Sequence, residues 1–348
     1  MSLADRYFVE MCKEVLEHGT STEGNKVRTK WEDGTPAHTK KIFGVAHRYD
    51  LSKEFPILTL RKVPIKSCVD ELLWIWQKRS NKLSDLHSHI WDSWGLSDGT
   101  IGKSYGYQLS SPVRLKRDAI TFEGLCKAFN GGVIPEMHAP VDFKGDKETY
   151  IPEILFRNHH TTDYRFSHLY TVRGCPVALE VDDFVYINQV DYVLYQLHNT
   201  PFSRRILTNM YNHSELADMA LEPCAYSMTF NVTKDENGEL VLNGILNQRS
   251  QDILTANGWN VCQYAVLLHM IARDVNMLVG TLIHVIADAH IYDRHIPLVE
   301  KLIWGEQHEA PELVLNPEKK HFYDFVPEDV GLTNYRYNEF SEKIPVAI

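Results

Sequence analysis

The stretch LEPCAYSMTFNV, residues 221–232, alternates apolar and polar side chains directly after a proline. Because successive side chains of a strand point to opposite faces, this period of two predicts a half-buried β-strand. The set that would share one side is Cys224, Tyr226, Met228, Phe230 and Val232. Free cysteine is among the most buried residue types, so Cys224 is either a packing residue or a nucleophile placed where the strand begins.

Periodic segments on both sides of this strand predict the elements that pack around it. Residues 5–20 predict an amphipathic helix, with Phe8, Met11, Cys12 and Val15 recurring at helical spacing. Residues 64–82 predict another amphipathic helix, and residues 188–207 predict a helix, a turn and a strand. Residues 239–275 predict a strand, a polar turn and a helix with an apolar row through Val261, Ala265, Leu268 and Ala272. Residues 280–295 predict a strand rich in β-branched side chains. The mixture predicts an α+β fold with a large mixed β-sheet packed against helices.

Residues 111–186 differ in amino-acid composition from the rest of the chain. Their first part is rich in Gly, Pro and charge, and their second part is polar and aromatic. We predict an inserted small domain or elaborate loop, which interrupts one domain spanning residues 1–348. His159 and His160 lie in this insert, and we expect them to be solvated, because no acidic or thiol-bearing residue is spaced to use them.

The composition narrows the class of protein. The chain has 348 residues, of which 44% are hydrophobic and 24% charged, as in ordinary soluble globular proteins. Its formal net charge of −10 disfavours a nucleic-acid binder, since phosphate affinity comes mainly from Lys and Arg. A small phosphorylated substrate remains compatible with this charge, because it needs only a few local arginines.

Cysteine usage and hydropathy predict a cytoplasmic protein. The six cysteines form no C-x-x-C pair, which is typical of reduced thiols. No stretch reaches the roughly 18 apolar residues of a membrane span, and the first residues lack the pattern of a signal peptide. His87 and His89 are two residues apart on a predicted loop, which is a weak pattern for a metal site, and we predict no metal.

Several polar residues are placed where phosphate chemistry would use them. Arg28 lies in a turn, and Arg204 and Arg205 stand together before an apolar strand, where solvation would be harder to supply. Arginine side chains donate the paired hydrogen bonds that suit phosphate. The polar turn NQRSQD adds Gln248, Arg249, Ser250 and Asp252. Positive neighbours lower the pKa of a thiol, so a cysteine near these arginines would gain thiolate character.

These segments, taken in order, resemble the thymidylate synthases. The resemblance rests on EPCAYSMTFNV, NQRSQD, WNVCQYAVLLHMIA and ADAHIYDRH, supported by VRTKWEDGTPAHT, DELLWIWQ, IWDSWG, GKSYGYQL, SRRIL, APELVLNPEKKHFYDF and the terminal PVAI. It covers about three quarters of the chain, and residues 111–186 fall outside it. It implies a homodimer formed through a face of the sheet.

The resemblance implies a reaction and gives Cys224 a role in it. The cysteine would add to C6 of the uracil ring of deoxyuridylate (dUMP), and C5 would take a methylene group from 5,10-methylenetetrahydrofolate. A hydride from the folate would complete the methyl group, giving thymidylate (dTMP) and dihydrofolate. The folate would be carbon donor and reductant at once, so no nicotinamide and no metal would be needed.

The resemblance also assigns roles to matching positions. The catalytic set would be Cys224, Glu71, Tyr105, Arg249 and Asn260. The dUMP-binding set would be Arg28, Arg204, Arg205, Gln248, Arg249, Ser250, Asp252, Asn260, His290 and Tyr292, with Arg204 and Arg205 reaching the partner's site. The folate-binding set would be Glu71, Ile90, Trp91, Trp94, Leu221, Asp252, Trp259, Tyr292 and Ala347. The Ile348 carboxylate would help to close the site.

Two departures from the family pattern and three alternatives stay open. Ala225 stands where the family usually has histidine, and LTANGWN replaces the usual Leu-Gly-x-Pro-Phe-Asn turn. Asn260 lies at the edge of a predicted helix, where it could be only an N-cap. A dUMP hydroxymethylase, in which water captures the methylene, would show the same residues. A non-catalytic RNA-binding or regulatory homologue is the third alternative, which the acidic charge disfavours.

Overall fold

The computed structural model describes residues 2–129, 136–138, 168–172, 175–181 and 183–348. Its α-helices are α1 (Leu3–His18), α2 (Ile65–Trp76), α3 (Gly106–Ser110), α4 (Phe122–Phe129), α6 (Gln189–Asn199), α7 (Gly258–Asp274) and α8 (Ile296–Leu302). A π-helical turn, Ile253–Asn257, leads into α7. Short 3-10 turns lie at Leu83–Asp85, Asp92–Trp94, Arg117–Ala119, His213–Asp218, Asp293–His295, Phe322–Asp324 and Pro327–Asp329. No described helix is long and apolar enough to cross a membrane.

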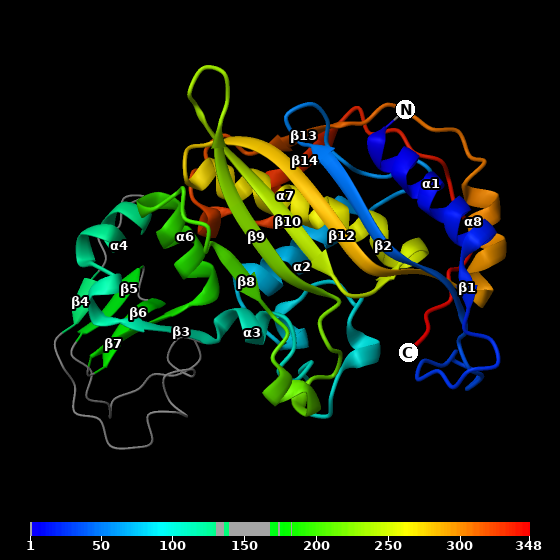
Figure 1. Cartoon of the computed structure of the whole chain (residues 1–348), viewed down its shortest axis with the longest axis horizontal. Coiled ribbons are helices and arrows are strands. Elements are labelled where there is room, and N and C mark those ends of the chain that lie inside the picture. Colours follow the sequence, from blue (N-terminus) through cyan, green and yellow to red (C-terminus); the bar gives the residue numbers. More distant parts are fainter. Residues whose placement is uncertain (1, 130–135, 139–167, 173–174, 182) are drawn as a thin grey trace.

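A seven-stranded mixed sheet forms the centre of the molecule (Figure 1). Its order is β1 (Thr20–Ser21), β2 (Thr39–Asp50), β12 (Leu278–Tyr292), β10 (Leu240–Gln248), β9 (Ala225–Lys234) and β8 (Leu207–Asn209), with β11 (Gln251–Asp252) beside β12. The pairs β10–β12 and β11–β12 are parallel and the other pairs are antiparallel. The prediction of a large mixed sheet packed against helices is confirmed.

The strand β9 follows the predicted alternation over most of its length. Met228, Phe230 and Val232 are buried, and the intervening Asn231 is exposed. The register with β10 shifts between Asn247 and Gln248, which pair with Ser227 and Ala225 and leave Tyr226 as an extra residue. This β-bulge breaks the period of two, so Ala225 is buried where simple alternation would place it on the opposite side from Met228.

The helices α2 and α7 supply the main core on one face of this sheet (Figure 1). The predicted apolar row of α7 is fully buried, from Val261 through Ala265 and Leu268 to Ala272. Burial in α2 is wider than one face, because every residue from Cys68 to Trp76 is buried. In α1 the predicted row of Phe8, Met11, Cys12 and Val15 is buried.

A second, five-stranded antiparallel sheet has the spatial strand order β3-β7-β6-β5-β4. Its strands are β3 (Pro112–Lys116), β4 (Glu136–His138), β5 (His168–Val172), β6 (Cys175–Val181) and β7 (Phe184–Asn188). These strands lie almost entirely within residues 111–186, the range whose composition differs from the rest of the chain. That this range is an inserted small domain stays a prediction. His159 and His160 lie outside the described residues. A two-stranded sheet, β13 (Glu312–Leu315) and β14 (Val330–Thr333), completes the fold.

Candidate active site

Cys224 lies immediately before β9, in a loop held from two sides. Its backbone N–H donates to the Tyr105 hydroxyl over 3.0 Å, and its carbonyl accepts from the backbone N–H of Arg249 over 2.9 Å. The Arg249 guanidinium donates to the carbonyl of Pro223 over 3.1 Å and to that of Glu222 over 2.7 Å. The guanidinium charge is therefore fixed against the loop that presents the half-buried Cys224.

Two opposed effects act on the Cys224 thiol. Burial raises its pKa, and it outweighs the lowering by the charges of Arg249 and Arg28 and by the hydrogen bond with Tyr105. The prediction that nearby arginines lower the pKa of this thiol is confirmed in direction, although burial has the larger effect. The two arginines therefore reduce, but do not cancel, the rise in thiol pKa that burial causes.

A cleft of about 320 Å³ brings together residues from three distant segments. Its lining holds five of the predicted nucleotide residues, namely Arg28, Arg249, Ser250, His290 and Tyr292. Thr29, Thr39, Lys41 and Asp288 also contribute. Three cationic side chains line one small cleft, so it suits an anionic group such as phosphate.

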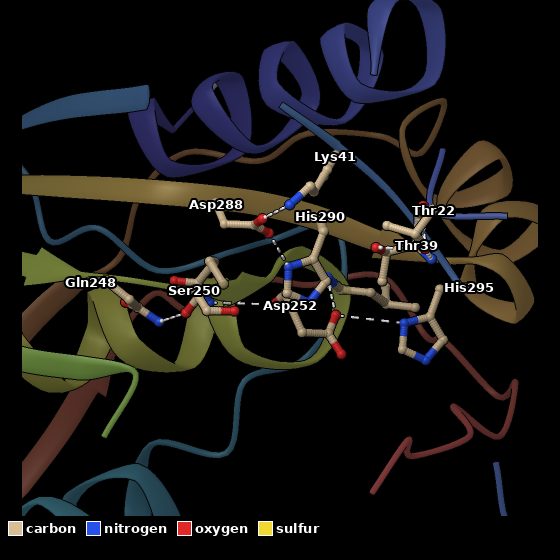
Figure 2. A network of polar contacts seen from close by, with 11 residues as sticks. Thr22, Thr39, Lys41, Gln248, Ser250, Asp252, Asp288, His290 and His295 are labelled. Atoms are coloured by element: carbon tan, nitrogen blue, oxygen red, sulfur yellow. Dashed lines mark hydrogen bonds and ion pairs between the residues drawn. The ribbon is translucent and has the colours of Figure 1, made fainter. Parts of the chain in front are cut away.

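Lys41 and Asp288 are site residues that the sequence analysis missed (Figure 2). Lys41 Nζ lies 2.5 Å from Asp288 Oδ2, and Asp288 Oδ1 lies 2.9 Å from His290 Nδ1. Burial would raise the pKa of Asp288, but the hydrogen bonds with His290 and Lys41 hold it below its ordinary value. A sequence signal exists for Asp288, which stands two residues before His290 on a predicted strand, so both side chains share one face. None exists for Lys41, because only the pairing of β2 with β12 places it opposite His290.

Asp252 caps the π-helical turn that leads into α7. Its Oδ1 accepts from the backbone N–H groups of Leu254 and Thr255 over 3.0 and 3.2 Å. Its carboxylate also lies 3.5 Å from His295 Nδ1 (Figure 2). Burial would raise the pKa of Asp252, but the hydrogen bond and charge of His295 hold it low. Asp252 thus shapes the turn where the sequence departs from the family pattern.

Glu71 forms the centre of an aromatic cluster next to Cys224. Its buried carboxylate accepts from the indole N–H of Trp91 and of Trp259, each over 2.5 Å, and from the side-chain amide of Gln263. Burial raises the pKa of Glu71 in spite of these three donors. The ring of Trp91 also lies 5.6 Å from that of Trp94 and 5.2 Å from that of Tyr105. The predicted folate-side tryptophans are therefore gathered around one carboxyl group.

Tyr105 joins the Glu71 cluster to the Cys224 loop and has a strained backbone. Its φ angle of 41° is in the left-handed region, which a bulky residue rarely adopts. The next residue, Gly106, packs so closely that a Cβ would lie 2.3 Å from the carbonyl oxygen of Ser80. Such strain persists only where surrounding structure imposes it, and it concentrates at functional sites. Burial raises the pKa of the Tyr105 hydroxyl well above its ordinary value.

The N-cap interpretation of Asn260 is wrong. Asn260 lies inside α7, whose preceding π-helical turn is capped by Asp252. Its side chain instead contacts Gln248 and Gln263, at 3.2 and 3.4 Å. Neither Gln263 nor His284, which bonds to Gln248, was predicted as a site residue. Gln263 and His284 each stand within an apolar stretch of their helix or strand, and no feature of that local sequence distinguishes them from residues that only pack in the core.

The remaining predicted residues lie around this centre. Ile90 is 38% exposed, and the half-buried Leu221 accepts from Ser104 Oγ through its carbonyl. Ala347 is half-buried, and Ile348 pairs with Lys30 through backbone hydrogen bonds of 2.8 and 2.9 Å. Arg204 and Arg205 are exposed, so the expectation of difficult solvation is wrong, and neither lines the cleft.

The two loop histidines have other partners. His87 Nδ1 lies 2.8 Å from Asp70, and His89 Nδ1 lies 3.0 Å from Asp92. Within the described ranges, no three His, Cys, Asp or Glu side chains gather in a way that could hold a metal ion.

Comparison with known proteins gives a family. The thymidylate synthase family profile matches residues 6–348. The chain belongs to the thymidylate synthase family. Thymidylate synthase 1 of Bacillus subtilis strain 168 is 36% identical over 343 residues, 97% of each chain, and the thymidylate synthase of Bacillus phage phi3T is 35% identical over the same coverage.

A solved structure agrees with the sequence relatives. The thermostable thymidylate synthase A from Bacillus subtilis superposes with a TM-score of 0.72 at 35% identity, covering 99% of both chains. The thymidylate synthase fold and the methyltransferase class that the sequence predicts are thereby confirmed.

Proposed function

We propose that this chain converts dUMP to dTMP with 5,10-methylenetetrahydrofolate as carbon and hydride donor. The observation that carries the proposal is the position of Cys224. Its backbone N–H bonds to the Tyr105 hydroxyl, the carbonyl of the preceding Pro223 accepts from the Arg249 guanidinium, and Arg249 also lines the cationic cleft. The cleft holds the dUMP phosphate, with Arg28, Arg249 and Ser250 as ligands, while His290 and Tyr292 bind the ribose hydroxyl.

Covalent addition activates the pyrimidine. The Cys224 thiolate adds to C6 of uracil, which makes C5 an enolate carbon that attacks the folate methylene. The C5 proton then leaves, assisted by Tyr105 and by water held at Glu71. The folate amine is expelled, and its C6 hydride reduces the exocyclic methylene. Departure of the Cys224 thiolate gives dTMP and dihydrofolate.

The folate lies on the tryptophan side of the site. Trp91, Trp94 and Trp259 offer aromatic faces for its ring system, and Ile90, Leu221 and Ala347 complete the apolar lining. Glu71 joins this side to the nucleotide side, because it bonds to two of the tryptophans and to Gln263.

The site is completed by a second copy of the chain. Arg204 and Arg205 are exposed and lie outside their own subunit's cleft, so their side chains are available to a partner's phosphate. The sheet also exposes large apolar side chains, with Phe43 on β2 at 91% and Ile245 on β10 at 37%. Burial of such side chains favours association through the sheet. The unpaired thiols of the described cysteines fit a cytoplasmic enzyme.

One assay tests the reaction. Enzyme, dUMP and methylenetetrahydrofolate are mixed, and the folate product is identified. We expect dihydrofolate and dTMP from wild type, and under a few per cent of that rate from Cys224→Ser, whose hydroxyl is hardly ionised at neutral pH. If the products are instead tetrahydrofolate and a hydroxymethylated nucleotide, the enzyme is a dUMP hydroxymethylase and the proposal is refuted. Full activity in Cys224→Ser would remove the cysteine from the mechanism.

A further inference from the structure

Asn260 belongs to a row of hydrogen-bonded side-chain amides. Gln248 Nε2 donates to Asn260 Oδ1 over 3.2 Å, and Gln251 Nε2 is a second donor to the same oxygen at 3.4 Å. On the opposite side, Asn260 Nδ2 donates to Gln263 Oε1 over 3.4 Å. Gln248 and Gln263 are each only 3% exposed, so water does not compete freely for these contacts.

Backbone carbonyls, which only accept hydrogen bonds, fix the orientation of both glutamines. Gln248 Nε2 donates to the carbonyl of Ser250 over 3.0 Å, and Gln263 Nε2 donates to that of Cys68 over 3.1 Å. Gln263 Nε2 also donates to the carboxylate of Glu71. A carbonyl cannot donate, so the nitrogen of each glutamine must face it, and each glutamine oxygen must point the other way.

His284 supports this arrangement from inside the sheet. Its Nε2 lies 2.8 Å from Gln248 Oε1, so Nε2 carries the proton and donates. Burial lowers the pKa of His284 to about 3, which keeps the ring neutral near pH 7. The row thus has a fixed donor at one end and a fixed acceptor at the other.

The orientation of Asn260 follows from its two neighbours. Its oxygen faces the nitrogen of Gln248, and its nitrogen faces the oxygen of Gln263. A flipped Asn260 amide would set two donors against each other at Gln248 and two acceptors against each other at Gln263. Buried polar groups left without partners are costly, so one orientation is held.

The two orientations would suit different bases. An amide that accepts from N3–H and donates to O4 matches uracil, whereas the flipped amide donates to N3 and accepts from the N4 amino group of cytosine. We propose that Gln263, together with Gln248, sets the preference for uracil by holding the Asn260 amide in one orientation. This rests on the proposed function and on the role in dUMP binding that the family resemblance implies for Asn260, which we take to be a contact with the base. Gln263 is then a positioning residue that touches no substrate.

The test removes the acceptor that holds Asn260 Nδ2. Gln263→Met keeps the length of the side chain and loses the amide. Gln196→Met is the matched control, because Gln196 is a buried glutamine (5% exposed) on α6, outside this row. The dissociation constants of dUMP and dCMP are measured by calorimetry for each protein, with the melting temperature as a check of folding.

We expect the dCMP/dUMP ratio of dissociation constants to fall about tenfold in Gln263→Met, because one hydrogen bond that opposes the flip is lost. The control should keep the wild-type ratio. A general loss of stability, or a changed Glu71, would affect both nucleotides and leave the ratio unaltered.

An unchanged ratio in folded Gln263→Met overturns the proposal. If that variant does not fold, Gln263→Asn, whose shorter amide cannot span Asn260 and Cys68, takes its place with the same expected and contrary results. Failure of the proposed function is seen separately in wild type. Wild type that does not bind dUMP would refute both the proposed function and this inference, whereas wild type that binds dUMP but forms no dTMP would refute only the proposed reaction.

Discussion

The clearest electrostatic consequence of the structure concerns Arg249 and the reactivity of Cys224. Burial raises the pKa of the thiol, while the charge of Arg249 opposes that rise. Arg249→Met removes the charge and leaves the side-chain volume nearly intact. The pKa of Cys224 should then rise further, so that the thiolate is scarcer at every pH below it.

The magnitude follows from the fixed geometry of the guanidinium. Its two hydrogen bonds hold the charge beside residues 222 and 223, at 2.7 and 3.1 Å from their carbonyl oxygens. A nearby opposite charge favours an ion by on the order of 1.4 kcal/mol, a factor of ten in population. At pH 8 the alkylation of Cys224 should therefore be about tenfold slower in Arg249→Met than in wild type.

The assay is alkylation by iodoacetamide, an uncharged reagent, read at the Cys224 peptide by mass spectrometry because the chain has six cysteines. The rate should rise tenfold per pH unit below the pKa and reach the same plateau in both proteins at high pH. Arg114→Met, on β3 of the other sheet, is the control and should match wild type. Equal rates of wild type and Arg249→Met at pH 8, with equal plateaus, would refute the electrostatic argument.

Three further outcomes are expected. Hybrid dimers that pair a Cys224→Ala subunit with an Arg204→Ala/Arg205→Ala subunit should regain activity at one of two sites, and inactive hybrids of verified composition would disprove the shared site. Gly106→Ala should lower the free energy of unfolding by about 1–3 kcal/mol in denaturant titration, because its methyl group meets a rigid backbone carbonyl; an unchanged midpoint would contradict this. Lys41→Met should raise the KM for dUMP severalfold at low salt and less at high salt, since the cleft loses one of three cations; a salt-independent effect would argue against an electrostatic role.

Local pattern predicted the elements well, because their periodicity reflects one buried face. The rows through Val261 in α7 and through Phe8 in α1 are buried as predicted, and β9 alternates as predicted from Ser227 onward. The bulge at Tyr226 could not be predicted, since an extra residue is fixed by the partner strand rather than by the strand that carries it.

The sequence by itself determined the family and the residue types of the site, because the order of the motifs along the chain can be read without knowing the structure. Only the tertiary structure decided which groups meet. It brings Lys41 into contact with Asp288 across two strands and Gln263 of α7 into contact with Glu71 of α2. It also shows that Asn260 lies inside α7 and is not its N-cap. It also showed that burial outweighs the arginines at Cys224, because desolvation depends on every atom packed around the thiol, whereas a sequence displays only neighbours along the chain.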